Sequence, residues 1–258
     1  MISVVILTKN EEANIGKCLA SIRWCDEIIV VDDYSKDKTV ERIMNHELRI
    51  KDNKRIKIFR RHLEGDFASQ RNYGLSKAKG DWVLFVDADE IVSEELEKEI
   101  LSTCYPRSCR AESISSSYGI LKQVQDDNNL LEQNKFSGYY LKRSDYFLGR
   151  WLKYGETGNI KLLRLARREA GNWYGKIHEV WQIEGKVSQL DNPLLHYPHK
   201  DTWVFLLKIN WYTDCVVQYW KEQGRKITFW QILLYPLGKF IHNYLVRRGF
   251  LDGVPGLI

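Results

Sequence analysis

The chain has 258 residues and a mass of 30.5 kDa, which is enough for one large domain or for a domain with an appendage. Its composition, 44% hydrophobic and 28% charged, is that of a globular protein and excludes a disordered chain. The net charge of +5 is modest, and the basic, aromatic C-terminal segment suggests an anionic membrane surface before a nucleic acid, because it also carries long aliphatic runs.

The five cysteines are scattered and form no CxxC pair: Cys18, Cys25, Cys104, Cys109 and Cys215. No histidine lies near them at zinc-site spacing, so we expect reduced thiols in a cytosolic setting. Met1 leads directly into a strand pattern, and we expect no signal peptide. No uncharged apolar run reaches about 18 residues, so we expect no membrane-spanning helix.

Strand and helix patterns alternate through the first hundred residues. Apolar, β-branched runs predict strands, and apolar residues at helical spacing predict helices between them. The expected strands cover residues 2–8, 27–33, 55–60 and 82–86, and the expected helices cover 13–22, a segment ending at 44, and 67–78. This alternation predicts right-handed βαβ crossovers and a parallel sheet.

Polar and acidic residues follow three of these strands. Thr8 ends the first, Asp32 and Asp33 follow the second, and Asp87 and Asp89 follow the fourth. Because ligands bind beyond the carboxyl ends of strands in open α/β sheets, we expect these residues to share a site. Two aspartates one residue apart suit Mg²⁺ or Mn²⁺ that already carries phosphate oxygens.

Each of these features also has a simpler interpretation. Residues 87–90 could merely lead into a helix whose first turn favours acids, and residues 32–37 could be a turn with a helix cap. Arg71 could be a solvated helix charge, or it could reach a diphosphate through paired hydrogen bonds. The convergence of the strand ends favours a functional site.

Five segments in order resemble a family 2 glycosyltransferase of the GT-A fold: residues 4–12, 18–21, 27–37, 71–74 and 87–90. The resemblance implies an α/β fold with a Rossmann-like nucleotide-binding sheet, a mixed sheet in the acceptor half, and inverting transfer from a nucleotide-diphospho sugar. Asp89, or else Asp87, would bind the divalent metal, Mg or Mn. The residues implied for the nucleotide sugar are Thr8, Asn10, Glu12, Asp32, Asp33, Arg71, Asp87 and Ala88.

We expect four segments. Residues 1–101 form the nucleotide-sugar-binding half, and residues 102–134 form an inserted polar loop, because they are aperiodic and rich in Ser, Gln and Asn. The part at 119–127 resembles repeat-derived peptides inserted into bacterial genes. Residues 135–199 form the acceptor half, and residues 200–258 form C-terminal amphipathic helices.

A general base is expected in the acceptor half. A carboxylate between aromatic residues suits this role, since partial burial raises its pKa toward neutral pH, and Glu179 lies in such a segment. His178 and Glu179 could instead be a structural pair. Lipopolysaccharide-core enzymes of the family carry a similar histidine–glutamate pair, whereas many other members use an aspartate from a different motif. Glu156 is the second candidate.

The C-terminal segment combines basic and aromatic residues. From Lys200 onward the sequence holds eight Lys or Arg, four Asp or Glu, and four of the nine Trp. Helices over 201–220 and 228–248 would place aromatic rings and basic side chains at a membrane surface, although they could also simply cover the sheet. The stretch 247–253 resembles the C-terminal end of lipopolysaccharide-core enzymes.

These features predict a peripheral enzyme on the cytoplasmic face of the bacterial inner membrane. It would move a sugar, glucose by resemblance, from a UDP-sugar to a lipid-linked saccharide such as the lipopolysaccharide inner core. Two alternatives remain open: a polyprenyl-phosphate sugar transferase, which needs no base, and an impaired nucleotide-sugar-binding protein. A nucleotidyltransferase is disfavoured, because no Gly-rich phosphate loop follows the first strand.

Overall fold

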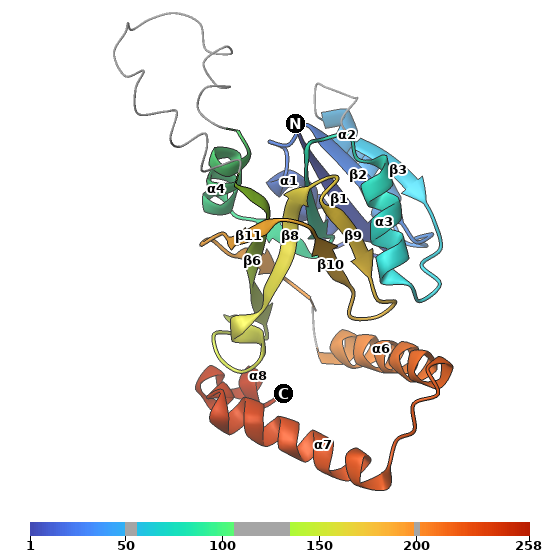
Figure 1. Ribbon diagram of the computed structural model, residues 1–258, viewed down its shortest axis with the longest axis vertical. Helices are drawn as coiled ribbons and strands as arrows, with labels where there is room; N and C mark the ends of the chain where they lie inside the picture. The colour runs from blue at the N-terminus through green and yellow to red at the C-terminus, as the bar shows by residue number, and fades with distance from the viewer. Residues whose placement is uncertain (50–55, 106–134, 199–201) are drawn as a thin grey trace, which may run out of the picture.

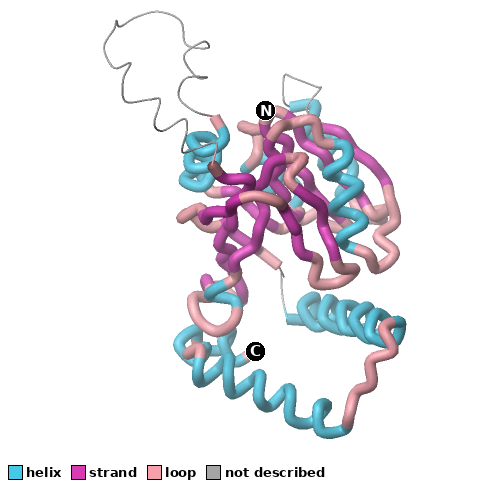
Figure 2. Tube along the Cα trace, viewed as in Figure 1, coloured by secondary structure: helices cyan, strands magenta, loops and turns pink. Residues whose placement is uncertain are grey.

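The computed structural model describes residues 1–49, 56–105, 135–198 and 202–258, without the side chains of 46–49 and 159. One large sheet runs through the fold, and two long helices lie beyond one of its ends (Figure 1). The same division is visible in Figure 2, where the strands gather in the upper part and the lower part is helical.

The first half of the chain supplies the parallel side of this sheet: β1 (Ile2–Thr8), β2 (Glu27–Asp32), β3 (Ile56–Arg60) and β4 (Trp82–Asp87). It also supplies the short β5 (Glu90–Val92), which lies at the opposite edge of the sheet in an antiparallel pair. The helices of this half are α1 (Ile15–Ser21), α2 (Thr39–Arg49), α3 (Phe67–Lys77) and α4 (Glu94–Cys104). The predicted order of strands and helices is therefore confirmed.

The second half makes the sheet mixed. Its strands are β6 (Phe136–Phe147), β7 (Arg150–Trp151), β8 (Lys161–Arg167), β11 (Lys186–Gln189) and β12 (Leu194–His196). Strand β8 is antiparallel to both β4 and β6, and β7 is antiparallel to β6, whereas β11 and β12 pair with β6 in parallel. The order along the sheet is β3-β2-β1-β4-β8-β6-β12-β5, and β7 and β11 also pair with β6. Strands β9 (Gly171–Tyr174) and β10 (Val180–Ile183) form a separate hairpin. Strand β5 pairs with β12, so the two expected halves share one sheet.

Side chains alternate between the two faces of the sheet because successive residues of a strand point to opposite sides. Val4 and Ile6 of β1 pack with α1 and α4, whereas Val5 packs with α3 and the β9–β10 hairpin. Gly74 permits this second contact, since a Cβ atom there would lie 2.5 Å from Cγ1 of Val5. Asp66 accepts a hydrogen bond from the Ser69 N–H and caps α3.

The pairing register brings the strand ends to one edge. Thr8 pairs with Asp32, and Leu7 pairs with Asp87, in parallel ladders. The expected convergence of residues 8, 32 and 87 is thus confirmed.

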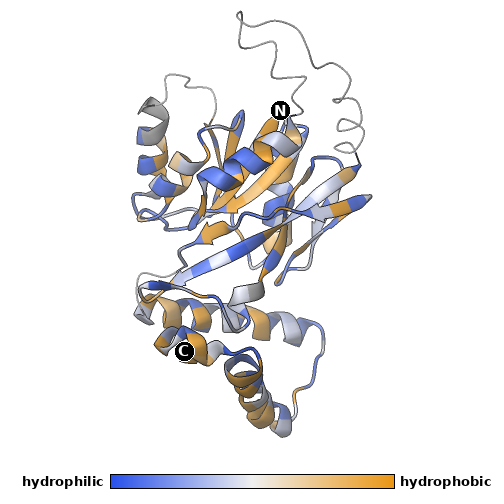
Figure 3. Ribbon diagram, turned by 90° about the vertical axis from the view of Figure 1, so that its left-hand side faces the viewer, coloured by the Kyte–Doolittle hydropathy of each residue, from blue (hydrophilic) through white to orange (hydrophobic). Residues whose placement is uncertain are grey.

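The C-terminal part contains α6 (Thr202–Glu222), α7 (Phe229–Ile241), the π-helical turn η3 (His242–Val246), the 3-10 turn η4 (Gly249–Asp252) and α8 (Val254–Leu257). Another 3-10 turn, η2 (Thr157–Asn159), precedes β8. Every residue of α7 is exposed, and Figure 3 shows this helix as mostly hydrophobic. In the described ranges, no helix is both long and apolar enough to cross a membrane.

One predicted boundary is wrong. Residues 102–104 were assigned to an inserted loop, but they form the last turn of α4, because Ile100 and the partly buried Leu101 and Cys104 continue its apolar face. The rest of the expected insertion, from 106 to 134, lies outside the described residues. Cys18, Cys25, Cys104 and Cys215 take part in no disulfide bond between described residues, and Cys109 lies outside the described residues.

Candidate active site

Two buried arginines hold the carboxylate of Asp87 at the end of β4. Arg71 Nη2 lies 3.1 Å from Oδ1, and Arg164 Nη2 lies 2.6 Å from Oδ2. Burial alone would raise the pKa of Asp87, but the charges of Arg164 and Arg71 outweigh it and hold that pKa far below its usual value. Asp87 is therefore ionised, with both oxygens engaged.

Arg71 also binds the predicted base. Its Nε donates to Oε1 of Glu179 at 2.8 Å, and its guanidinium lies 4.7 Å from the centroid of the Trp173 ring. Helix α3 is fixed against β9 by Asn72, whose side chain makes two 2.8 Å hydrogen bonds with the Trp173 backbone. Arg71 is 6% exposed, and its Nη1 is buried with no hydrogen-bond partner within the described residues.

Glu90, the last residue of the acidic segment 87–90, completes this cluster, although the sequence predicts no role for it in the site. Its side chain is fully buried, accepts from the Asp87 N–H at 2.8 Å, and lies 3.6 Å from Nη2 of Arg164. Burial, together with the charge of Asp87, raises the pKa of Glu90 despite Arg164. Strand β5 begins at Glu90, so residues 87–90 form a turn between two strands and do not lead directly into α4.

His196 of β12 links Asp89 to a second buried aspartate. Its Nε2 lies 3.6 Å from Oδ1 of Asp89, and its Nδ1 lies 3.0 Å from Oδ1 of Asp145 on β6. Burial lowers the pKa of His196, but the two carboxylates outweigh it and raise that pKa to about 9. The imidazole is therefore a cation at neutral pH.

Helix α6 covers the same site. Lys208 places its Nζ 3.3 Å from Oε1 of Glu11 and 3.6 Å from Oδ2 of Asp89. One turn later, Tyr212 forms a 3.0 Å hydrogen bond with Nδ1 of His178, the neighbour of Glu179. Phe205, Lys208 and Tyr212 follow the spacing of one helix face, so this face of α6 lies along the site.

The residues predicted for the nucleoside form a neighbouring group of loops. Buried Asp32 accepts from the N–H and hydroxyl of Ser35, and Asp33 pairs with Lys9 at 2.6 Å. Buried Thr8 has an Oγ1 without a hydrogen-bond partner in the described part of the chain. Unpartnered buried donors such as this hydroxyl and Arg71 Nη1 are expected where a polar ligand binds.

Three other predicted residues have structural contacts in this conformation. Asn10 accepts from the Lys36 N–H at 2.8 Å, and Glu12 accepts from the Lys38 N–H at 3.0 Å, so both join the loop after β1 to the loop after β2. The side chain of Ala88 lies in the hydrophobic core. Any contact of Ala88 with a nucleotide would therefore come from its backbone.

The two base candidates lie in different groups of residues. Glu179 contacts Arg71 and so belongs to the Asp87 cluster. Glu156 pairs with Lys239 of α7 at 2.7 Å and accepts from Asn243 at 3.4 Å. This grouping favours Glu179 beside the predicted donor site.

The fit of a divalent metal differs between the two aspartates. Within the described residues, no three His, Cys, Asp or Glu side chains form a group that could hold a metal. Asp87 fits poorly, since both its oxygens are taken by arginines. Asp89 fits better as a single ligand, because its contacts with His196 and Lys208 are longer, at 3.6 Å each, and Mg²⁺ needs only one or two carboxylates beside substrate phosphates.

Comparison with known proteins decides the family. A family model described as Glycosyl transferase family 2 matches residues 3–172. The chain belongs to glycosyl transferase family 2. This family 2 chain is 26% identical to the lipopolysaccharide core biosynthesis glycosyltransferase LpsC of Rhizobium meliloti. That alignment covers all of this chain and 85% of LpsC. It is 25% identical to the uncharacterized glycosyltransferase RT0209 of Rickettsia typhi, again over its whole length and 80% of that protein.

A solved structure supports the fold. Residues 1–349 of TarS from S. aureus, in complex with UDP-GlcNAc, superpose with a TM-score of 0.50 and 17% identity. The match covers 78% of this family 2 chain and 59% of that one. The expected GT-A fold, with a nucleotide-binding parallel side and a mixed acceptor side, is confirmed.

Proposed function

We propose that this family 2 enzyme transfers a sugar, with inversion, from a UDP-sugar to a lipid-linked saccharide of the lipopolysaccharide-core type. The observation that carries the proposal is the position of Arg71. It joins Asp87 to Glu179 and keeps one buried N–H free. A guanidinium with a free donor beside the strand ends suits the diphosphate of a nucleotide sugar.

Each carboxylate has a separate role in this proposal. Asp87, ionised between its arginines, orients Arg71 and the ribose side of the donor. Glu179 takes the proton from the acceptor hydroxyl, which attacks the anomeric carbon in one displacement and so inverts it. Arg71 separates the base from Asp87 and stabilises the charge that develops on the departing diphosphate.

Asp89 would hold the divalent cation, Mg or Mn. When bound, such a cation supplies further charge stabilisation to the leaving diphosphate. His196 keeps Asp89 in place through the chain to Asp145, so the carboxylate is oriented before any substrate arrives. Burial would raise the pKa of Asp89, but His196 and Lys208 lower it, and Asp89 is ionised at neutral pH.

The acceptor class rests on the relationship to LpsC, a lipopolysaccharide core biosynthesis glycosyltransferase. The exposed apolar residues of α7 support a membrane contact, since Phe229, Trp230 and Tyr235 are each at least 65% exposed. We propose that the enzyme is a peripheral protein on the cytoplasmic face of the bacterial inner membrane. Glucose is the sugar that the sequence resemblance suggests.

A screen of donors tests this proposal. Purified protein is incubated with UDP-, GDP- and dTDP-sugars, Mn²⁺ or Mg²⁺, and a deacylated core oligosaccharide, and the product anomer is read by NMR. The proposal expects turnover with one UDP-sugar and an inverted linkage. Transfer to a polyprenyl phosphate instead would favour the alternative transferase, and nucleotide binding without any turnover would favour the impaired binder.

A further inference from the structure

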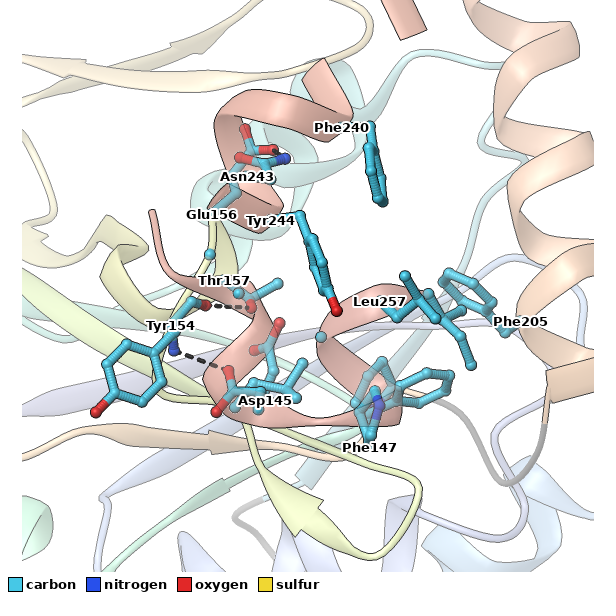
Figure 4. Close-up of a pocket in the computed structure, with 18 of the residues that line it drawn as sticks. Asp145, Phe147, Tyr154, Glu156, Thr157, Phe205, Phe240, Asn243, Tyr244 and Leu257 are labelled. Atoms are coloured by element: carbon cyan, nitrogen blue, oxygen red, sulfur yellow. Dashed lines mark hydrogen bonds between the residues drawn. The ribbon is translucent and has the colours of Figure 1, made fainter. Parts of the chain in front are cut away.

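A cavity of about 480 Å³ lies beside the site, between the sheet and the C-terminal helices (Figure 4). We call it the C-terminal pocket. Its walls include Asp145, Glu156, His196, Lys239, Tyr244 and Leu257. Its volume falls within the range of small-molecule sites, about 300–1,000 Å³.

The pocket begins next to the proposed donor site. His196 is part of its wall, and the same imidazole lies 3.6 Å from the carboxylate of Asp89. Phe205 of α6 lines the pocket, whereas Lys208, one turn along the same helix face, contacts Asp89. A ligand in the pocket would thus lie one side chain away from Asp89, which we assign to the divalent cation.

The charged side chains of the pocket are already partnered. Arg143 contacts Asp145 at 2.8 Å, and Lys239 contacts Glu156 at 2.7 Å. Asp252 accepts hydrogen bonds from the backbone N–H groups of Lys153 and Tyr154. A neutral, polyhydroxylated ligand can donate to these carboxylates and accept from these cations without separating the pairs.

Aromatic rings supply the apolar part of the lining. Phe240 and Tyr244 are stacked, with ring centroids 5.2 Å apart, and Phe147 and Phe205 lie at the same spacing. In Figure 4 the Tyr244 ring extends from the C-terminal helical segment between Thr157 on one side and Leu257 on the other. Sugar rings present an apolar C–H face and a hydroxyl edge, and both have counterparts here.

The C-terminal wall is folded against the rest of the molecule. Asp252 is 2% exposed, and its carboxylate accepts from the N–H groups of Lys153 and Tyr154. Gly249 and Gly256 pack so closely that a Cβ atom on Gly256 would lie 1.9 Å from the Gly249 carbonyl oxygen. Residues 249–257 therefore form a fixed part of the pocket.

We propose that the C-terminal pocket binds an uncharged sugar ring of the acceptor saccharide, next to the hydroxyl that is glycosylated. This assignment rests on the proposed glycosyl transfer and adds the acceptor subsite to it. Helix α7 contributes Lys239 and Phe240 to the pocket and carries the exposed apolar residues 229–237 before them. A lipid-linked acceptor could thus place its sugar in the pocket while its lipid remains in the bilayer beside α7.

Two pocket variants test the assignment. Tyr244→Ala removes a ring of the lining, and Leu257→Trp fills the cavity from a position that is 52% exposed and tolerant of size. Tyr140→Ala, an exposed tyrosine of β6 outside the pocket, is the matched control. Calorimetry in the presence of UDP measures binding of a deacylated core oligosaccharide, with and without its phosphates, and thermal melting checks folding.

We expect both pocket variants to weaken oligosaccharide binding at least 10-fold, with UDP affinity within two-fold of wild type. Removing the phosphates should change the wild-type affinity less than three-fold. Unchanged binding in both folded variants, or loss of binding on dephosphorylation, would overturn the assignment, as would absence of oligosaccharide binding to wild type. Failure of the transferase itself would be seen separately, as absence of UDP-sugar binding.

Discussion

Arg71 and Glu179, 108 positions apart in the chain, form a 2.8 Å ion pair beneath the carboxyl end of the sheet. The pair joins α3 to the segment between β9 and β10. It also places the predicted donor-binding arginine and the predicted base in direct contact. The first two predictions follow from this contact.

Arg71→Lys should weaken donor binding. A lysine keeps the charge but cannot hold Asp87 and Glu179 at once and still present a free N–H to a diphosphate. We expect the UDP affinity to fall at least 10-fold, and the free energy of unfolding to fall by about 2 kcal/mol, because the partly buried Glu179 carboxylate loses a charged hydrogen bond. Calorimetry and urea denaturation measure the two effects. Arg168→Lys, at a more exposed arginine, is the control, and equal UDP affinities in the two variants would contradict the role.

Glu179→Gln should slow the chemical step and leave donor binding intact. Glutamine can still accept from Arg71 Nε, but it cannot take a proton, so kcat should fall by about 10²-fold or more. Single-turnover transfer measures this, with Glu184→Gln, an exposed carboxylate, for comparison. An unchanged rate would exclude Glu179 as the base and support the polyprenyl-phosphate alternative.

The apolar surface of α7 gives a third prediction. Trp230 and Leu233 are 65% and 55% exposed, so Trp230→Ser with Leu233→Ser should leave the fold unchanged. Burying two such side chains in lipid contributes about 3 kcal/mol or more, so the double variant should bind vesicles at least 10-fold more weakly. Flotation with phosphatidylethanolamine–phosphatidylglycerol vesicles measures this. Met44→Ser, an exposed apolar residue of α2, is the control, and an equal loss in this control would count against α7.

The fourth prediction concerns Glu27, which anchors the other end of the sheet. Its carboxylate accepts hydrogen bonds from the Ser3 hydroxyl, the Lys57 ammonium and the Lys79 N–H. Burial alone would raise the pKa of Glu27, but these three partners outweigh burial, so the pKa lies below its usual value of 4.5. Its stabilising effect is therefore present above about pH 4.5 and is lost as the pH falls through the lower, folded-state value.

Glu27→Gln should therefore reduce the loss of stability on acidification. Urea midpoints at pH 7, 5 and 4 provide the measurement, and Glu169→Gln, at an exposed carboxylate, is the control. If the midpoint of Glu27→Gln falls with pH as steeply as that of the wild type, Glu27 does not contribute in this way.

The sequence predicts the donor side of the fold well, because its information is local. Each strand of the parallel side is an apolar run that ends in a polar residue, and parallel pairing necessarily brings Thr8, Asp32 and Asp87 to one edge. The sequence does not predict the true end of α4, because Ser102 and Thr103 are typical of loops. In the structure, Leu101 and Cys104 continue the apolar face of this helix.

Other parts of the site could not be read from the sequence. Arg164, His196 and Lys208 come from three separate elements, and each reaches an aspartate only through tertiary packing. Arg164 had one available signal, a charge in the middle of an apolar strand. The amphipathic pattern of α6 does not indicate that one face of this helix covers the site, as Lys208 and Tyr212 do. The membrane role of both C-terminal helices stays a prediction.

Glycosyl transfer by this enzyme should depend on Asp89 and on a divalent cation. Transfer from the preferred UDP-sugar should be measured with Mn²⁺ or Mg²⁺, after EDTA, and after metal is restored, in wild type and in Asp89→Ala. Asp191→Ala, at an exposed aspartate, serves as the control. We predict turnover that EDTA abolishes and metal restores, and a loss of at least 10²-fold in Asp89→Ala alone. Turnover in Asp89→Ala equal to that of wild type, or unaffected by EDTA, would contradict the account.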